Sequence, residues 1–167
     1  MKVSVACRPH FLTNIKMNSD SSTSDTGHKA SAVFDFIVYE VKETLALITI
    51  NRPEKHNAIS LQTLSELQTA VGLAAADEAV RVVAITGAGG RSFASGSDLN
   101  EVMHRDLKKA LEPIVQGLAQ QLEELPKSTI AAIDGICMGG GLEIALGCDM
   151  RICAKGRRFG TPEGKLG

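Results

Sequence analysis

Three consecutive glycines, Gly139 to Gly141, stand between two apolar stretches near the end of this 167-residue chain. The apolar run at 130–133 predicts a short buried strand, and residues 140–146 predict a helix. Because glycine has no Cβ, a ligand or another backbone segment can approach such a turn closely. The first amides of a helix lack internal partners, and the helix dipole adds positive potential there. The turn therefore suits a phosphate or a developing oxyanion, or it is simply a tight strand-to-helix connection.

The sequence before the glycine turn alternates short apolar runs with helical patterns. Residues 34–41 and 45–50 predict an antiparallel hairpin, and Pro53 ends the second strand because it cannot extend the ladder. Across the rest of the chain, the predicted elements are a helix capped by Ser60, a strand at 80–86, a Gly- and Ser-rich loop at 87–98, helices at 99–103 and 106–125, and a strand at 150–154. This alternation predicts an α/β fold in one domain.

Two glutamates follow the predicted strands of this region. Glu143 lies in the first turn of the glycine helix, and Glu163 follows the strand at 150–154. If the strands are parallel, their carboxyl ends share one sheet edge, where both glutamates would meet the loop at 87–98. Two carboxyl groups at such an edge can act as a general acid and a general base. Taken singly, each has a simpler interpretation, as a helix-dipole partner or as a surface residue.

Composition and the absence of certain sequence motifs exclude several classes of function. The formal net charge of −1 gives no electrostatic reason to expect a nucleic acid or an anionic membrane as partner. No apolar run approaches the roughly 20 residues that span a bilayer. The four cysteines lack metal-ligand spacing, so we predict reduced thiols and no metal site. A P-loop is absent, and the dinucleotide pattern that begins at Gly87-Ala88-Gly89 fails because Ser92 occupies its third glycine position.

The first 33 residues differ from the remainder. Residues 18–26 read NSDSSTSDT, a polar, low-complexity stretch that predicts a disordered extension before a folded region at 34–167. Residues 1–17 carry three basic side chains and no acidic one, as in mitochondrial transit segments, although Pro9 interrupts any amphipathic helix. We predict a cytoplasmic protein, with a mitochondrial location as the alternative.

Four motifs, in this order, resemble those of the crotonase, or enoyl-CoA hydratase/isomerase, superfamily. They are NRPEKHNA at 51–58, FASGSDL at 93–99, GICMGGGLEIALGCD at 135–149 and FGTPEGKLG at 159–167. The resemblance runs from about Phe34 to the last residue. It implies a crotonase-like spiral of β-β-α turns, truncated before the C-terminal helical region with which family members build trimers or dimers of trimers.

The resemblance also assigns roles to individual residues. Family members stabilise a thioester enolate with two backbone amides, which fall on Ser97, where alanine is more common, and on Gly140. The two glutamates of family hydratases fall on Glu143 and Glu163. The remaining positions are implied to contact the substrate: Lys55 at a phosphate, Ala58 at the CoA moiety, and Ala94, Asp98, Leu99 and Gly139 around the pocket.

The resemblance implies an enoyl-CoA hydratase-like lyase that adds water to a 2-trans-enoyl-CoA and yields a 3-hydroxyacyl-CoA. The CoA thioester is the substrate, and no metal or redox cofactor is expected. The pair of glutamates favours hydration over double-bond isomerisation, in which one carboxylate can suffice. Isomerisation and other crotonase-type reactions of acyl-CoA remain alternatives. A non-catalytic fragment that binds acyl-CoA also remains an alternative, because the motifs end at Gly167.

Overall fold

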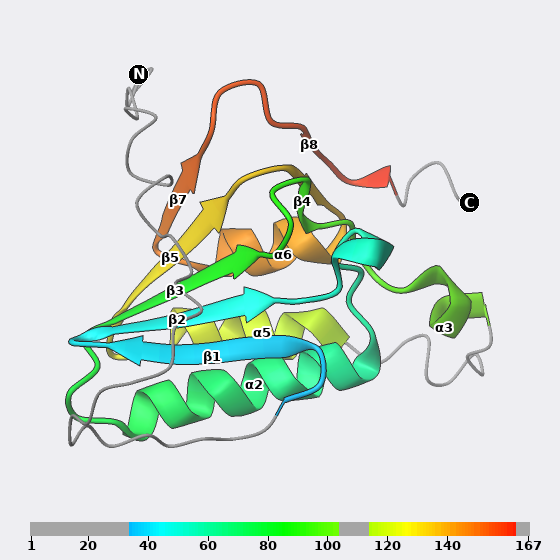
Figure 1. Cartoon of the computed structure of the whole chain (residues 1–167). Helices are drawn as coiled ribbons and strands as arrows, with labels where there is room; N and C mark the ends of the chain where they lie inside the picture. The colour runs from blue at the N-terminus through cyan, green and yellow to red at the C-terminus, as the bar shows by residue number, and fades with distance from the viewer. Residues whose placement is uncertain (1–33, 104–113, 163–167) are drawn as a thin grey trace, which may run out of the picture.

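The computed structural model describes residues 34–103 and 114–162, so the predicted extension at 1–33 and Glu163 lie outside the described residues (Figure 1). The described residues form a five-stranded sheet in the order β1-β2-β3-β5-β7 and a three-stranded sheet in the order β4-β6-β8. The larger sheet contains β1 (Ile37–Lys42), β2 (Leu45–Ile50), β3 (Val82–Gly87), β5 (Ser128–Ile133) and β7 (Met150–Cys153). The smaller sheet contains β4 (Ser92–Ala94), β6 (Ile136–Met138) and β8 (Phe159–Gly160). The helices within this part of the chain are η1 (Pro53–Lys55), α2 (Leu61–Ala76), α3 (Leu99–Met103), α5 (Ile114–Glu123) and α6 (Gly140–Gly147).

The predicted hairpin is confirmed by the pairing of β1 and β2, which are antiparallel with Lys42 opposite Leu45. β1 begins three residues later than predicted. The later start has a tertiary cause: the backbone amides of Asp35 and Phe36 donate to the carboxylate of Glu66 on α2 rather than to a neighbouring strand. These bonds tie the start of the described chain to α2.

The predicted parallel arrangement is also confirmed. β3 pairs in parallel with β2 and with β5, and β7 pairs in parallel with β5. The carboxyl ends of these four strands therefore lie along one edge of the sheet, which Figure 1 shows on the side of η1 and β4. The turns and helices that follow these strands begin at this edge.

The smaller sheet has no counterpart among the predicted elements. β4 lies inside the predicted loop at 87–98, and β6 and β8 contain only three and two residues. Such short strands cannot display the alternation from which a strand is predicted. β3 and β5 each pass into a strand of this sheet, and α6 follows β6, so the chain winds in the β-β-α turns that the resemblance implies.

The helices pack on one another and on the larger sheet. Ser60 caps α2 as predicted, because its Oγ accepts the amide of Thr63 at 3.0 Å. α5 packs against both α2 and α6 and contributes Leu118 and Leu122 to the buried core. The predicted helix at 106–125 is shorter within the described residues, since α5 ends at Glu123, and residues 104–113 lie outside them.

Candidate active site at the carboxyl ends of the parallel strands

The glycine turn between β6 and α6 exposes the start of a helix. Gly139 has φ 50° and ψ −127°, a conformation essentially restricted to glycine. Its carbonyl accepts the amides of Leu142 at 2.8 Å and Glu143 at 3.1 Å, which closes the first turn of α6. The Gly140 amide has no acceptor among the described residues. It is therefore one of the orphan donors at a positive helix end, where an oxyanion can be stabilised.

The loop that carries Ser97 lies beside this helix start. A Cβ built on Gly96 would lie 3.7 Å from the nitrogen of Gly140, and one built on Gly140 would lie 3.8 Å from Ser97 Oγ. The Ser97 amide has no acceptor among the described residues either. The structure thus brings together the two segments whose amides the family resemblance implies as one oxyanion site.

Close backbone packing holds α6 against β4. A Cβ on Gly141 would lie 2.6 Å from the carbonyl oxygen of Ala94 and 2.7 Å from its Cβ, so no larger residue fits there without movement. Ala94 itself is fully buried in the core. Contact between Ala94 and a substrate stays a prediction, while its contact with Gly141 is direct.

Glu143 is half-buried on α6 and lines a groove of about 570 Å³ between α5 and α6. The opposite wall includes Gln116, Gln120 and Glu123 of α5. The groove therefore combines carboxyl and amide side chains with the glycine helix. Glu163, the second predicted catalytic carboxyl, follows β8 in the sequence and lies outside the described residues.

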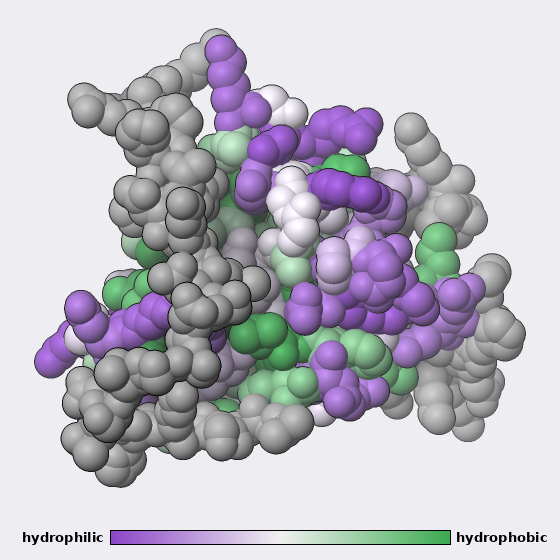
Figure 2. Space-filling view, viewed as in Figure 1, coloured by the Kyte–Doolittle hydropathy of each residue, from purple (hydrophilic) through white to green (hydrophobic). Residues whose placement is uncertain are grey.

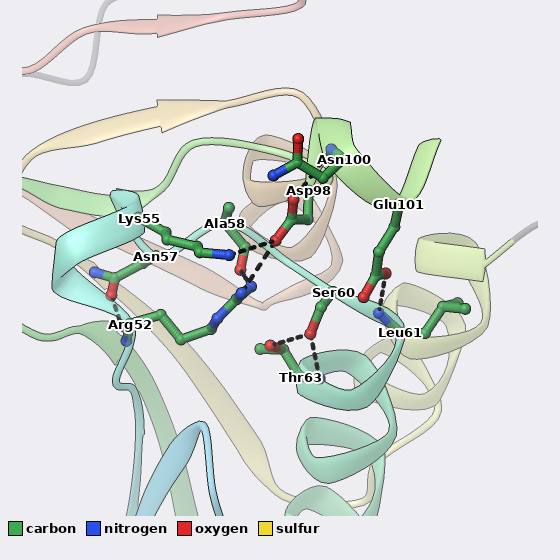
Figure 3. Close-up of polar contacts among 10 residues, drawn as sticks. All are labelled: Arg52, Lys55, Asn57, Ala58, Ser60, Leu61, Thr63, Asp98, Asn100 and Glu101. Atoms are coloured by element: carbon green, nitrogen blue, oxygen red, sulfur yellow. Dashed lines mark hydrogen bonds and ion pairs between the residues drawn. The ribbon is translucent and has the colours of Figure 1, made fainter. Parts of the chain in front are cut away.

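The residues predicted to bind CoA lie around η1, where Figure 2 shows hydrophilic side chains gathered. Lys55 is half exposed, and its Nζ lies 3.9 Å from Asp98 Oδ2. Ala58 is half-buried, and its carbonyl accepts a hydrogen bond from Arg52 (Figure 3). Leu99 is 58% exposed, so its side chain is available to a ligand.

Asp98 is placed differently, because its carboxylate is buried among protein donors. Burial of the carboxyl acts to raise its pKa, but three contacts outweigh this effect: the hydrogen bond from Arg52 Nη2, at 3.0 Å, the backbone amide of Asn100, and the charge of Lys55. The pKa of Asp98 is therefore lower than usual, and the group is anionic at neutral pH. Such a side chain orders the loop around it, and its contact with a substrate stays a prediction.

Arg52 and Asn57 are two residues of this region that the sequence did not single out. Asn57 is fully buried. Its side-chain amide donates to the carbonyls of Ala88 and Ser92, and its Oδ1 accepts the amide of Arg52 at 3.0 Å. Asn57 thereby joins the segment after β2 to the turn between β3 and β4. Both residues belong to the NRPEKHNA motif, and this was the one sequence signal that could have identified them.

The described residues contain no group of three or more His, Cys, Asp or Glu side chains that could hold a metal ion. Within the same part of the chain no helix is long and apolar enough to cross a membrane. Cys137, Cys148 and Cys153 are free thiols, the first two buried. These findings concern the described part alone, and the predicted lack of a cofactor stays a prediction.

Comparison with known proteins places these features in one family. Residues 40–167 match the model of the enoyl-CoA hydratase/isomerase family. A short-chain-enoyl-CoA hydratase of Clostridium acetobutylicum is 38% identical over 133 residues, which cover 78% of this chain and 51% of that protein. A crotonyl-CoA hydratase of Syntrophomonas wolfei is 38% identical over 136 residues, covering 80% and 52%. The chain thus spans about half the length of these curated relatives.

Solved structures agree with the sequence matches. An enoyl-CoA hydratase/isomerase from Xanthobacter autotrophicus superposes with a TM-score of 0.73 at 37% identity, covering 80% of this chain and 51% of the other. The enoyl-CoA hydratase from Thermoplasma volcanium gives 0.74 at 34% identity, covering 79% and 53%. The predicted crotonase-like fold is confirmed. The chain belongs to the enoyl-CoA hydratase/isomerase family.

Proposed function

We propose that this protein takes part in the hydration of a 2-trans-enoyl-CoA to a 3-hydroxyacyl-CoA. The proposal rests on one observation above all: the loop of Ser97 adjoins the exposed start of α6 at Gly140, and Glu143 lies one helical turn further on. The names of the relatives, which include a crotonyl-CoA hydratase, support an enoyl-CoA as the substrate class.

In the proposed mechanism, the thioester oxygen accepts hydrogen bonds from the amides of Ser97 and Gly140. The positive end of α6 polarises the carbonyl and makes C3 of the conjugated system electrophilic. Glu143 deprotonates a water whose oxygen bonds to C3, and the electron pair of the double bond moves into the enolate. Glu163 then protonates C2, so that one water molecule is added across the bond.

The direct test is incubation of the full chain with crotonyl-CoA, followed by loss of the ultraviolet absorbance of the conjugated thioester. In ¹⁸O-labelled water the new hydroxyl at C3 should carry the label. Isomerisation instead moves a double bond without incorporating oxygen, so starting from a 3-enoyl-CoA it raises that absorbance. Binding of the thioester without either change identifies a non-catalytic acyl-CoA-binding protein.

A pair of matched variants assigns the role of the α6 carboxylate. Glu143→Gln should lower kcat by about 10²- to 10⁴-fold, the usual contribution of general acid–base catalysis, while the dissociation constant of the thioester is retained. Glu78→Gln changes an exposed glutamate after α2, which ends at the opposite edge of the sheet, and should leave turnover unchanged. Turnover by Glu143→Gln equal to that of the parent chain would remove Glu143 from the mechanism.

A further inference from the structure

Arg52 is a buried arginine whose guanidinium joins two separate segments of the chain. It is only 5% exposed, and its Nη1 donates to the carbonyl of Ala58 at 2.6 Å. Its Nη2 donates to Asp98 Oδ2 at 3.0 Å (Figure 3). The guanidinium also lies over the ring of Phe36, 4.7 Å from the ring centre. Loss of one partner of a buried pair leaves an uncompensated charge, so this contact is costly to break.

The two segments that Arg52 joins are also joined by backbone hydrogen bonds around Ser97. The amide of Ile59 donates to the carbonyl of Gly96 at 2.8 Å, and the amide of Asp98 donates to the carbonyl of Ile59 at 2.9 Å. Along an extended chain, successive amides point in opposite directions. Because the amide of Asp98 points toward Ile59, the amide of Ser97 points away from it.

We propose that Arg52 is a positioning residue for the backbone amide of Ser97. Its two donors hold Ala58 and Asp98, the neighbours of Ile59 and Ser97, and so lock the bridge between these segments. The orientation of the amide at the oxyanion site follows from that lock. This inference rests on the proposed function, since it gives the Ser97 amide the role of a donor to the thioester oxygen.

The chemistry of the arginine side chain makes the proposal specific. A guanidinium presents its donors in a fixed planar fork, so it can reach a carbonyl and a carboxylate at once. A lysine ammonium at the same position keeps the charge near Asp98 but lacks that fork. Arg52→Lys therefore separates the positive charge from the two-point attachment, which is the feature that the proposal requires.

The test compares Arg52→Lys with Lys127→Met in the full chain. Lys127 Nζ donates to the carbonyls of Ala74 and Asp77, at the sheet edge opposite the site. The control thus removes a cation and its hydrogen bonds without touching the Ser97 loop. The probe is 4-dimethylaminocinnamoyl-CoA, a thioester whose absorption moves to longer wavelength when its carbonyl is polarised. Both variants are compared below their unfolding transitions, so that a general loss of stability does not enter.

We expect Arg52→Lys to bind the probe and to lose most of the red shift that the parent chain produces. For crotonyl-CoA, kcat should fall by about 10- to 100-fold with KM little changed, as expected for misplacement of a catalytic donor. Lys127→Met should retain both the red shift and kcat. Retention of the red shift in Arg52→Lys, or an equal loss in Lys127→Met, would overturn the proposal.

Failure of the proposed function is distinguished from failure of this inference. If the parent chain binds the probe with a red shift but hydrates no enoyl-CoA, the proposed hydration is refuted. The red shift in Arg52→Lys, compared with that of the parent chain, still tests the positioning role of Arg52. If no thioester binds, hydrogen exchange of the Asp98 amide decides. Arg52→Lys should accelerate that exchange at least tenfold relative to the amides of α2, and an unchanged rate refutes the lock.

Discussion

Gly141→Ala tests the close packing that sets the position of α6. An alanine Cβ at this site would lie 2.6 Å from the carbonyl oxygen of Ala94, whereas ordinary contacts begin at 3.4 Å. The shortfall is about 0.8 Å, and the contacted atom belongs to the backbone, which has no side-chain rotation to relieve it. Helix α6 and strand β4 must therefore separate.

The cost of that separation follows from two opposing effects. Overpacking a tight contact typically costs about 1–3 kcal/mol. The preference of a helix for alanine over glycine returns up to about 1 kcal/mol. We expect a net loss of roughly 1–2 kcal/mol in the free energy of unfolding. Because Gly140 moves with α6, kcat for crotonyl-CoA should also fall, by up to about 100-fold for a displacement near 1 Å.

Urea unfolding followed by circular dichroism gives the stability change by linear extrapolation. The matched control is Gly72→Ala in α2, where the nearest atom to a new Cβ is Gln121 Nε2 at 4.0 Å, so the variant should gain up to about 1 kcal/mol. Adding Ala94→Gly to Gly141→Ala should recover only part of the loss, because the carbonyl oxygen remains in place. Equal stability of the Gly141→Ala and Gly72→Ala variants refutes the packing argument.

Three further predictions concern ionisable side chains. The lowered pKa of Asp98 means that its carboxylate stabilises the fold above the pKa of an unfolded aspartate, near 3.9, and that this stability is lost as pH falls through the lower folded pKa. In urea unfolding, the loss of unfolding free energy caused by Asp98→Asn should therefore shrink in acid. A loss that stays constant with pH contradicts this prediction. Burial raises the pKa of Cys137 to about 11 and that of Cys148 to about 12, so iodoacetamide at pH 8 should label exposed Cys153 before either, as peptide mass spectrometry can show. Lys55→Ala should raise KM for crotonyl-CoA with little change in kcat, and the reverse pattern would place Lys55 in the chemical step.

The framework of the site could be predicted from local sequence because its elements have local causes. The glycine turn needs residues without a Cβ, and the structure has Gly139 at a positive φ and Gly141 against Ala94. The parallel strands at 80–86 and 130–133 are short apolar runs, which is the pattern of strands buried on both faces. On the condition that these strands are parallel, the glycine turn and the loop at 87–98 are predicted to lie at one edge of the sheet.

The supports of the Ser97 loop could not be predicted in the same way. Arg52 precedes a proline and Asn57 lies four residues after that proline, and polar side chains in such a segment are usually exposed. Only a tertiary contact between residues 46 positions apart buries Arg52 with Asp98. The smaller sheet depends on pairing between segments of two or three residues, each too short to carry a pattern. Predictions from single segments fail where the partners are distant in sequence and the segments are brief.

The two amides of the proposed oxyanion site are held by different physical means. Gly140 is placed by the contact of Gly141 with Ala94, which is close packing and carries no charge. Ser97 is placed by backbone bonds to Ile59 and by the buried contact of Arg52 with Asp98. Neither support uses the hydroxyl of Ser97, which is exposed and forms no hydrogen bond among the described residues. We therefore expect that a serine, in place of the alanine that the family resemblance implies here, leaves the position of the amide unchanged.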